Sequence, residues 1–566
     1  MDIIAVLSQE LSVPKTQIES AVKLMDEGNT IPFIARYRKE VTGGLDDTIL
    51  RNLEERLHYL RNLEKRKQEV LELIAASGKL DDKQMEQMQK ALEEAKMLSE
   101  VEDLYRPYKQ KRKTRASVAR EKGLEPLAKF MLMQKPGGDL EQEAARYVNA
   151  EKGVEDVEQA LSGAGDILAE EISDSAQIRS RLREYLQKNA QISTTKGTKE
   201  NQIYDMYSEY SESVRKIAPH RILAIDRGER EEALKVSVEI DQQVCIGMIE
   251  NQVIHRNSPF AKVLHEVCED SFKRLIFPSL ERELRAQLTE KACAQAIGVF
   301  SENLKNLLMQ PPVKGCVTMG FDPAYRTGCK IAVVDETGKV LDTTVVYPTP
   351  PQNRTEQAKQ VLGSLIEKYG ITVITIGNGT ASKESEIFVA ELLSELNPKL
   401  EHKVSYMVVS EAGASVYSAS KLGAEEFPQF DVSLRSAVSI ARRLQDPLAE
   451  LVKIDPKAIG VGQYQHDMPP KEMDAALGGV VEDCVNKVGV DLNTASQSLL
   501  SYVAGINAAV AKNIVLYREE NGSFTKRSQL LSVSKLGKKA YEQCAGFLRV
   551  SESENPFDHT GVHPES

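Results

Sequence analysis

Two acidic residues in the middle of the chain each come directly after a short apolar run. Asp322 follows Val317–Phe321, and Glu411 follows Val404–Ser410. Carboxylate oxygens are preferred ligands of hard divalent cations, and two such cations can clamp the attacking and leaving oxygens of a phosphodiester. Asp322 and Glu411 are therefore candidate catalytic residues for metal-dependent cleavage of nucleic acid.

The elements that would position these two residues follow a definite order. Three strands joined by glycine-containing turns are expected first, at Val317–Phe321, Cys329–Asp335 and Val340–Tyr347. Helices and strands then alternate, at Gln357–Lys368, Ile371–Ile376, Ser385–Leu396, Val404–Ser410 and Leu434–Arg443. This is the element order of a ribonuclease-H-like domain, whose first strand ends in a catalytic carboxylate.

The acid set of this candidate site is incomplete. Gly377-Asn378-Gly379 stands after the fourth strand, where a resolvase of this fold carries a glutamate. Arg435 and Ser436 stand in the last helix where a carboxylate is expected, and the nearest acid is Asp431. Two dispersed carboxylates beside an arginine would hold Mg²⁺ poorly. We therefore expect a catalytically inert domain without metal or cofactor, in which Asp322 could equally cap a turn and the glycine loop could bind an anion.

The strongest electrostatic signal is the stretch 104–122, which carries eight positive charges and one acid in nineteen residues. Tyr105 and Tyr108 lie among these charges. A phosphate backbone is the natural partner of such a stretch, and binding would weaken steeply with salt. The alternative is a loop whose charges are neutralised by the acidic helices around it. The candidate contacts are Arg106, Lys109, Lys111, Arg112, Lys113 and Arg115.

Two repeats near the C-terminus match the pattern of helix-hairpin-helix elements. Residues 499–524 have their turn at 503–507, and residues 530–550 have theirs at 534–539. Such hairpins bind the nucleic-acid backbone, because amides at the start of the second helix face a phosphate oxygen. The alternative is a helical packing module, which an asparagine at a position often occupied by glycine favours slightly. The candidate contacts are Gly505, Asn507, Lys535, Gly537, Lys538 and Lys539.

Composition bounds the class of protein. A chain of 566 residues is long enough for several domains, and 41% hydrophobic with 28% charged residues is a globular composition without a membrane-spanning run. The seven cysteines form no CxxC pair, which favours reduced thiols in the cytoplasm and argues against structural zinc. A net charge of −11 argues against indiscriminate coating of nucleic acid but permits local basic surfaces.

Outside the ribonuclease-H-like domain, the apolar spacing predicts mainly helices. Residues 28–47 are expected as a loop in which Pro32, Phe33 and Ile34 pack inward, with base stacking as the alternative. The further expectations are a nearly continuous helix over 45–97, helices over 123–310 with one strand after a turn at Gly228, and a long helix over 271–310 broken near Pro278.

Four long segments of this sequence resemble, in the same order, the Tex family of bacterial transcription accessory proteins. They are GNTIPFIARYRKEVTGGLDD, EDLYRPYKQKRKTRASVAREKGLEPLA, TIGNGTASKESE and VSLRSAVSIARRLQDPLAELVKIDPKAIGVGQYQHDM. The resemblance implies a mainly α, multidomain and elongated protein with an inserted α/β domain of the YqgF type and a C-terminal helix-hairpin-helix domain. It also implies a transcription-linked role in nucleic-acid binding, and one eukaryotic family member associates with RNA polymerase and histones. Family members normally continue into an OB-fold RNA-binding domain, which would begin where this chain ends.

Together these observations predict six regions along the chain. They are a helical region with the basic loop at 1–200, a helical domain with a long linking helix at 201–312, the YqgF-type domain at 313–447, a linker and helix at 448–496, tandem helix-hairpin-helix elements at 497–552, and the start of an OB-fold domain at 553–566.

The function that we expect is a transcription accessory factor that binds RNA and/or DNA through the phosphate backbone, without sequence preference and without a membrane partner. One alternative is a nuclease or resolvase that uses Asp322 and Glu411. The other is a protein scaffold that docks on RNA polymerase through the helical N-terminal half.

Overall fold

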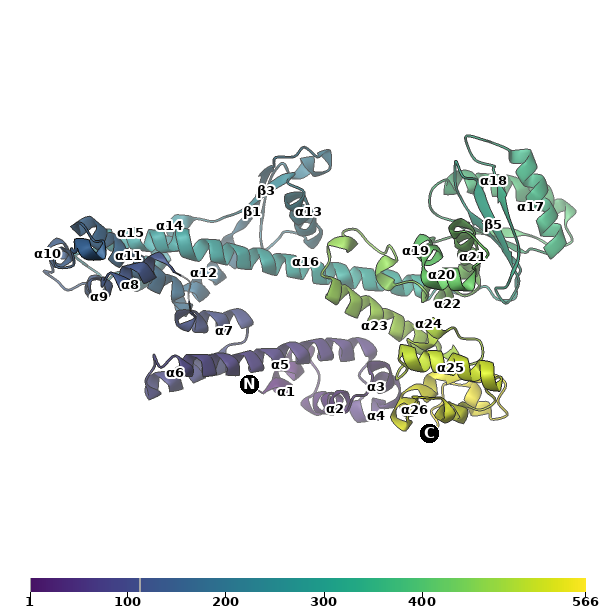
Figure 1. Cartoon of the computed structure of the whole chain (residues 1–566), viewed down its shortest axis with the longest axis horizontal. Coiled ribbons are helices and arrows are strands. Elements are labelled where there is room, and N and C mark those ends of the chain that lie inside the picture. The colour runs from purple at the N-terminus through teal and green to yellow at the C-terminus, as the bar shows by residue number, and fades with distance from the viewer. Residues whose placement is uncertain (1, 111–112, 566) are drawn as a thin grey trace. The chain divides into compact units, whose positions relative to one another are not determined.

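The computed structural model describes residues 2–110 and 113–565 as a mostly helical chain (Figure 1). Its contacts divide it into two compact units. The first contains Met1–Lys15 and Asn52–Gln295, and the second contains Thr16–Arg51 and Ala296–Ser566. Each unit is therefore built from segments that are distant in sequence. No helix in the described part of the chain is long and apolar enough to cross a membrane.

Helices form most of the first unit. In chain order they are α1 (Ile3–Leu11), α5 (Asp47–Ala76), α6 (Asp82–Glu94), α7 (Leu98–Tyr105), α8 (Arg115–Glu121), α9 (Glu125–Met133), α10 (Leu140–Ala145), α11 (Val157–Asp174), α12 (Ala176–Asn189), α13 (Pro219–Arg230), α14 (Gln242–Val253), α15 (Ala261–Asp270) and α16 (Phe277–Leu308). α5 begins in the second unit, and α16 ends there.

The nearly continuous helix predicted over 45–97 is in fact two helices, α5 and α6. Gly78 adopts a positive φ of 62° after the end of α5, a conformation that glycine reaches without a steric cost. Asp81 then caps α6, because its carboxylate accepts the Gln84 amide at 2.8 Å while the Gln84 side chain accepts the Asp81 amide at 3.1 Å. The prediction missed this break because apolar residues keep a helical spacing on both sides of it.

A small antiparallel sheet in the first unit was not fully predicted. Its strands β1 (Gln191–Lys196), β2 (Glu209–Ser213) and β3 (Leu234–Glu239) run in the order β2-β1-β3, and only β3 was expected. The strands lie on both sides of residue 200, where a domain boundary is predicted. β1 and β2 are rich in polar residues and expose much of their length, so they lack a clear apolar alternation.

Two predicted helix breaks in the first unit are wrong. Gly228 lies inside α13, where a Cβ atom would meet Leu234 Cδ1 at 2.6 Å, so this glycine serves close packing against β3. Pro278 lies in the first turn of α16, after the π-helical turn η4 (Ser271–Ile276). The backbone is helical on both sides of this turn, and the wider i→i+5 spacing of η4 accommodates a residue that has no N–H to donate.

The second unit contains a mixed five-stranded sheet. The strands are β4 (Thr318–Asp322), β5 (Cys329–Val334), β6 (Val340–Val346), β7 (Val373–Gly377) and β8 (Ser405–Val409), in the order β6-β5-β4-β7-β8. β4, β5 and β6 form an antiparallel meander, and β7 and β8 extend the sheet in parallel to β4. The predicted ribonuclease-H-like order of strands is confirmed.

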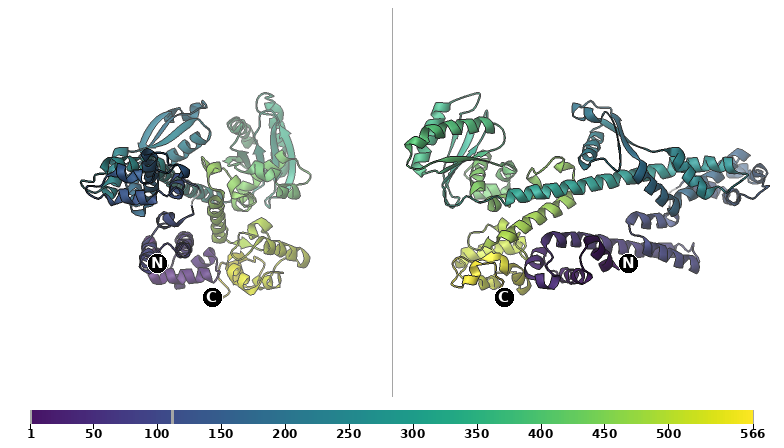
Figure 2. Two further views of the ribbon diagram at one scale, coloured as in Figure 1. Left: turned by 60° about the vertical axis from the view of Figure 1, so that its left-hand side comes forward. Right: turned by 180° about the vertical axis from the view of Figure 1, so that it is seen from behind.

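Helices cover both faces of this sheet. α17 (Thr355–Tyr369) and α18 (Ser382–Leu396) pack on one face, and α21 (Val432–Gln445) packs on the other (Figures 1 and 2). α19 (Ala414–Ala419) and α20 (Lys421–Glu426) precede α21 and were not predicted. Gly320 lets α21 approach β4, because a Cβ atom at this position would lie 2.1 Å from the Ala437 carbonyl oxygen. This close approach brings the start of α21 to the end of β4.

The remaining helices of the second unit come from both ends of the chain. They are α2 (Lys15–Asp26), α3 (Ile31–Tyr37) and α4 (Lys39–Thr42) near the N-terminus, and α22 (Pro447–Leu451), α23 (Pro470–Val488), α24 (Gln497–Leu500), α25 (Ala508–Asn521) and α26 (Lys538–Cys544) after the sheet. Two short parallel strands, β9 (Val490–Asp491) and β10 (Leu548–Arg549), join the start and end of the helix-hairpin-helix region.

Residues 28–47 form α3, α4 and the start of α5 rather than a loop. Pro32, Phe33 and Ile34 are buried, which confirms the prediction that they pack inward. The neighbouring Arg38 pairs with Glu542 at 2.7 Å, so this segment is held by contacts within the protein.

Candidate functional site

The two candidate carboxylates lie at the same end of the sheet. Asp322 is the last residue of β4, and Glu411 follows the end of β8; the two strands are parallel. Burial raises the pKa of Asp322 to about 6, a hydrogen bond from Ser436 opposes this rise, and the charge of Glu411 adds to it. The positive charge of Lys330, which faces Asp322 across the β4–β5 pair, has a smaller opposing effect.

The Glu411 side chain rests on the glycine loop that follows β7. A Cβ atom at Gly379 would lie 1.5 Å from Glu411 Oε1, and one at Gly377 would lie 2.8 Å from Oε2. Asn378 fixes the backbone of the same residue, because its Oδ1 accepts the Glu411 amide at 3.0 Å. The loop in which an anion site was predicted thus accommodates a carboxylate of the protein itself.

A buried arginine lies behind this carboxylate. Arg443 of α21 is 4% exposed, and its Nη1 donates to the carbonyl oxygens of Ser410 at 2.6 Å and Ala412 at 2.8 Å. Burial lowers the pKa of Arg443 to about 10, although the charges of Glu450 and Glu411 oppose this shift. Arg443 therefore shapes the loop that carries Glu411 and supplies positive charge to it.

The residues at this end of the sheet do not fit the metal pair of a ribonuclease-H-like nuclease. Asp322 and Glu411 are two carboxylates, with Ser436 and Lys330 beside Asp322 and Arg443 behind Glu411. Among residues 2–110 and 113–565, no group of three or more His, Cys, Asp or Glu side chains is arranged to hold a metal ion. Clamping a phosphodiester between two cations needs a larger set of anionic oxygens.

Some positive side chains of the basic stretch 104–122 form ion pairs with acids, and others are exposed. Arg106 pairs with Asp174 at 3.1 Å, and Arg120 pairs with Glu170 at 2.9 Å, so acids at the end of α11 neutralise part of the stretch. A pocket of about 1220 Å³ lies here, lined by these acids, Tyr105, Tyr108 and Lys109 among others. Lys109, Lys113 and Arg115 are exposed and available for a phosphate contact, while Lys111 and Arg112 lie outside the described residues.

The two hairpins share one backbone design. Gly505 has a φ of 78° and precedes by two residues Asn507, the N-cap of α25, whose Oδ1 accepts the Val510 amide at 3.0 Å. Lys535 has a φ of 67° and likewise precedes by two residues Gly537, the N-cap of α26. Lys535, and not Gly537, thus holds the left-handed position of the second hairpin.

The candidate residues of the hairpins differ in what they contact. Gly505 faces α26, because a Cβ atom there would lie 2.6 Å from that of Gln543, so its close approach serves helix packing. Lys539 donates to the carbonyl oxygen of Glu27, which precedes α3. Lys535, Lys538 and Asn507 are exposed. The second hairpin thus presents two lysines to solvent, and the third lysine holds the N-terminal segment.

Sequence reasoning did not identify Lys330 or Arg443 as members of the carboxylate site. Lys330 interrupts the buried strand β5 and is 8% exposed, with its Nζ donating to the carbonyl oxygens of Thr327 and Gly328 at 2.8 Å each. A lysine within an apolar strand predicts from the sequence alone that a polar group lies nearby, because a buried charge needs a partner. Arg443 gave no comparable signal, because arginine is common near helix ends.

A sheet of ribonuclease-H order followed by paired helical hairpins defines a class of multidomain proteins in which a nuclease-type fold accompanies a nucleic-acid-binding module. Family models for Tex proteins match most of this chain. The Tex-like protein N-terminal domain matches residues 1–75, the Tex central region 135–300, the Tex YqgF-like domain 316–445, and a helix-hairpin-helix motif 485–549.

Relatives match along nearly the whole chain. The transcriptional accessory protein Tex of Neisseria gonorrhoeae is 48% identical over 575 residues, which cover 100% of this chain and 74% of that protein. Protein tex of Bordetella pertussis is 47% identical over 585 residues, covering 100% and 72%. Human S1 RNA-binding domain-containing protein 1 is 40% identical over 569 residues, covering 97% and 56%. The chain belongs to the Tex family.

Proposed function

We propose that this protein is a transcription accessory factor that binds the phosphate backbone of RNA or DNA without reading base sequence. The observation that carries the proposal is the second hairpin, where Lys535 and Lys538 are exposed on either side of the N-cap of α26. Backbone amides and lysines recognise phosphate oxygens but carry no information about base identity. Lys109, Lys113 and Arg115 of the basic stretch supply a second set of contacts.

Charge reversal at the second hairpin tests the proposal. Lys535→Glu with Lys538→Glu should weaken binding to fluorescent single- and double-stranded RNA and DNA at least ~10-fold at low salt, because phosphate contacts dominate such affinity. The slope of log affinity against log salt should become shallower by about one to two. Titrations at several salt concentrations by fluorescence anisotropy measure both quantities.

A matched control reverses two exposed lysines of the ribonuclease-H-like domain, Lys399→Glu and Lys421→Glu. This variant has the same net charge but should bind like the wild type. Lys539 is left unchanged, because it holds the Glu27 carbonyl and its loss would disturb packing. Equal affinities of the hairpin variant and the wild type would reject the second hairpin as the contact.

The same titrations, run with Mg²⁺ and followed by a denaturing gel, separate the alternatives. Intact strands are expected, because Asp322 and Glu411 have no third carboxylate beside them among the described residues. Cleavage that Asp322→Asn abolishes would establish a nuclease instead. Absence of binding to every strand would favour a protein scaffold, whose pull-down with RNA polymerase should survive nuclease treatment. We place the protein in the cytoplasm, since its seven cysteines, all within the described residues, are buried and form no disulfide.

A further inference from the structure

One edge of the five-stranded sheet is unprotected. β8 pairs with β7 along its whole length and lies at the end of the strand order. Tyr406, Met407 and Val408 are 37%, 52% and 39% exposed, and the strand Ser405–Val409 contains neither a charged residue nor a proline. Edge strands normally carry such features, because a bare edge is a template for pairing with another strand.

The opposite edge, β6, carries the usual protection. Its register with β5 shifts between Val333 and Val334, which interrupts the regular ladder. Asp342 of β6 is charged and accepts hydrogen bonds from Tyr369 at 2.9 Å and Lys368 at 3.5 Å. Only one of the two edges of this sheet, β8, therefore lacks a charged residue and a register shift.

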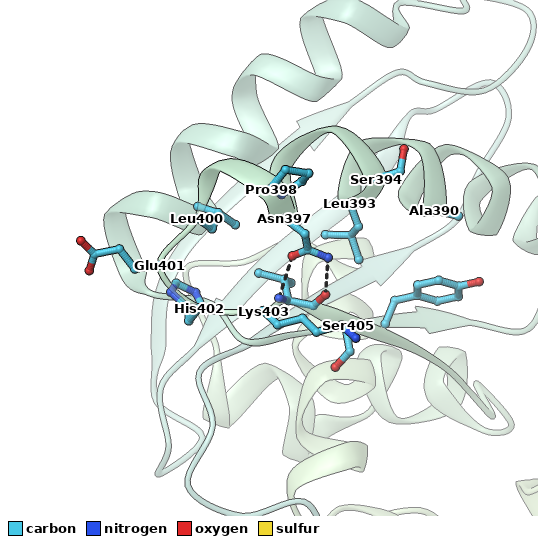
Figure 3. A pocket seen from close by; sticks show the side chains of 12 residues that line it. Ala390, Leu393, Ser394, Asn397, Pro398, Leu400, Glu401, His402, Lys403 and Ser405 are labelled. Carbon is cyan, nitrogen blue, oxygen red and sulfur yellow. Dashed lines mark hydrogen bonds between the residues drawn. The ribbon is translucent and has the colours of Figure 1, made fainter.

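Val404, the residue that precedes β8, has its outward N–H and C=O groups satisfied within the chain. The Asn397 amide accepts the Val404 N–H at 2.9 Å and donates to the Val404 carbonyl at 3.0 Å, as a neighbouring strand would (Figure 3). The next N–H, that of Ser405, points inward to Thr372 at 3.0 Å. By strand alternation, Tyr406 and Val408 direct their N–H and C=O groups outward, where the described part of the chain offers them no partner.

We propose that β8 pairs antiparallel with β8 of a second copy of this chain, with Met407 on the twofold axis. Tyr406 of each copy then lies opposite Val408 of the other. The outward N–H and C=O groups of these two residues form two hydrogen bonds in each of the two pairs, which makes four in total. The same register sets Lys403 of one copy opposite Glu411 of the other. The edge is thus self-complementary in both hydrogen bonding and charge, as an isologous interface requires.

The surface beside β8 has room for this second strand. A pocket of about 800 Å³ lies next to the start of β8, lined by Lys403, Ser405 and apolar residues of α18 and the segment after it (Figure 3). In the proposed register, residues 409–411 of the second copy run along this pocket. A five-residue pairing is small, so the dimer forms and dissociates with protein concentration.

Sedimentation velocity of the full chain over a wide concentration range tests the proposal. The wild type should shift from monomer to dimer as concentration rises. Val408→Pro removes one outward N–H from each copy and leaves the β7 ladder intact, so it should raise the dissociation constant roughly tenfold or more. Val408→Thr keeps the N–H and should dimerise like the wild type.

Charge substitutions on the two edges of the sheet provide a second test of the dimer. Met407→Lys places like charges at the axis and should abolish the dimer, whereas Val345→Lys, a matched change on the exposed edge β6, should leave it unchanged. Lys403→Glu should weaken the dimer, and this effect should fade at high salt. A wild type that stays monomeric at all concentrations would overturn the proposal, as would a dimer that tolerates Val408→Pro and Met407→Lys in variants whose unfolding temperatures match the wild type.

Discussion

Asp322 keeps the position of a catalytic acid but lacks the surroundings that favour its ionised form. Burial disfavours its charge, the Glu411 carboxylate repels it, and the opposing contributions of Ser436 and Lys330 are smaller than burial. The pKa of about 6 therefore represents a stability cost at neutral pH. This cost is what a divalent cation would offset in an active nuclease of this fold.

This cost predicts a pH-dependent stability difference. Because the native pKa of Asp322 is raised from 3.8 to about 6, the native state binds this proton more tightly, and the unfolding free energy falls as pH rises from about 4 to about 6. Asp322→Asn removes the charge, so the variant should be more stable than the wild type by ~1–2 kcal/mol at pH 8 and equal to it near pH 4. Scanning calorimetry across this pH range measures the difference.

Asp335 in the β5–β6 turn provides a control of opposite sign. Burial raises its pKa, but hydrogen bonds from Thr337 and Lys339 outweigh burial and the pKa is lowered overall. Its stabilising contribution is present above the unfolded pKa and is lost as pH falls through the native one. Asp335→Asn should therefore destabilise the protein at pH 8 and converge on the wild type in acid. The same pH response in both variants would contradict this account of Asp322.

At the scale of elements, a buried ion cluster joins helices of the first unit. Asp103 of α7 accepts from Arg179 Nε at 2.6 Å and from Arg183 Nη2 at 2.5 Å, both on α12. Arg183 also pairs with Glu283 of α16 at 2.5 Å. The Asp103 carboxylate thus joins α7 to α12, and Arg183 extends the cluster to α16. Removing one partner of such a cluster leaves buried charge without compensation.

Asp103→Ala should therefore lower the unfolding free energy by roughly 3–5 kcal/mol, because two buried guanidinium groups lose their shared partner. Urea denaturation, followed by helical circular dichroism, measures this loss. Glu184→Ala, which breaks the exposed pair with Lys188, should leave the unfolding free energy close to that of the wild type, because solvent screens this pair. A comparable effect of the two substitutions would show that the cluster contributes no more than a surface pair.

At the scale of the whole molecule, residues 16–51 and the C-terminal residues pack together in the second unit. Tyr37 donates to the Gly561 carbonyl at 2.9 Å, and Phe33 contacts the His563 ring. Arg527, which is 2% exposed, donates to the carbonyl oxygens of Phe557, Thr560 and Val562 at 2.7–2.9 Å. The residues after the second hairpin are therefore packed against the helix-hairpin-helix region.

Deleting residues 553–566 should loosen the second hairpin, because Arg527 would lose three carbonyl acceptors and its ion pair with Asp558. Amide hydrogen exchange over residues 527–549 should accelerate by at least ~10-fold. Peptides from the first unit provide the internal control and should exchange as in the wild type. Unchanged exchange over 527–549 would mean that these carbonyls are dispensable.

The sequence predicted the ribonuclease-H-like strands well, because β4, β5 and β7 are apolar runs bounded by glycine-containing turns. It failed for β1 and β2, whose polar residues carry no alternation, and at Pro278, where a proline in a first turn looks like a break. The site residues are a harder case. That Glu411 rests on Gly379, or that Lys539 holds Glu27, depends on contacts between distant segments that no local pattern encodes.

The hydrogen bond from Thr30 to the side chain of Gln543 spans 513 residues of sequence. At a synthesis rate of about 5–20 residues per second, roughly 25–100 s separate the appearance of these two residues at the ribosome. Until α23 and the helix-hairpin-helix region have been synthesised, α3, which contains the buried Phe33, lacks the native contacts that these later segments supply. The segment that contains α3 is therefore synthesised early but completes its native contacts only when the C-terminal residues appear.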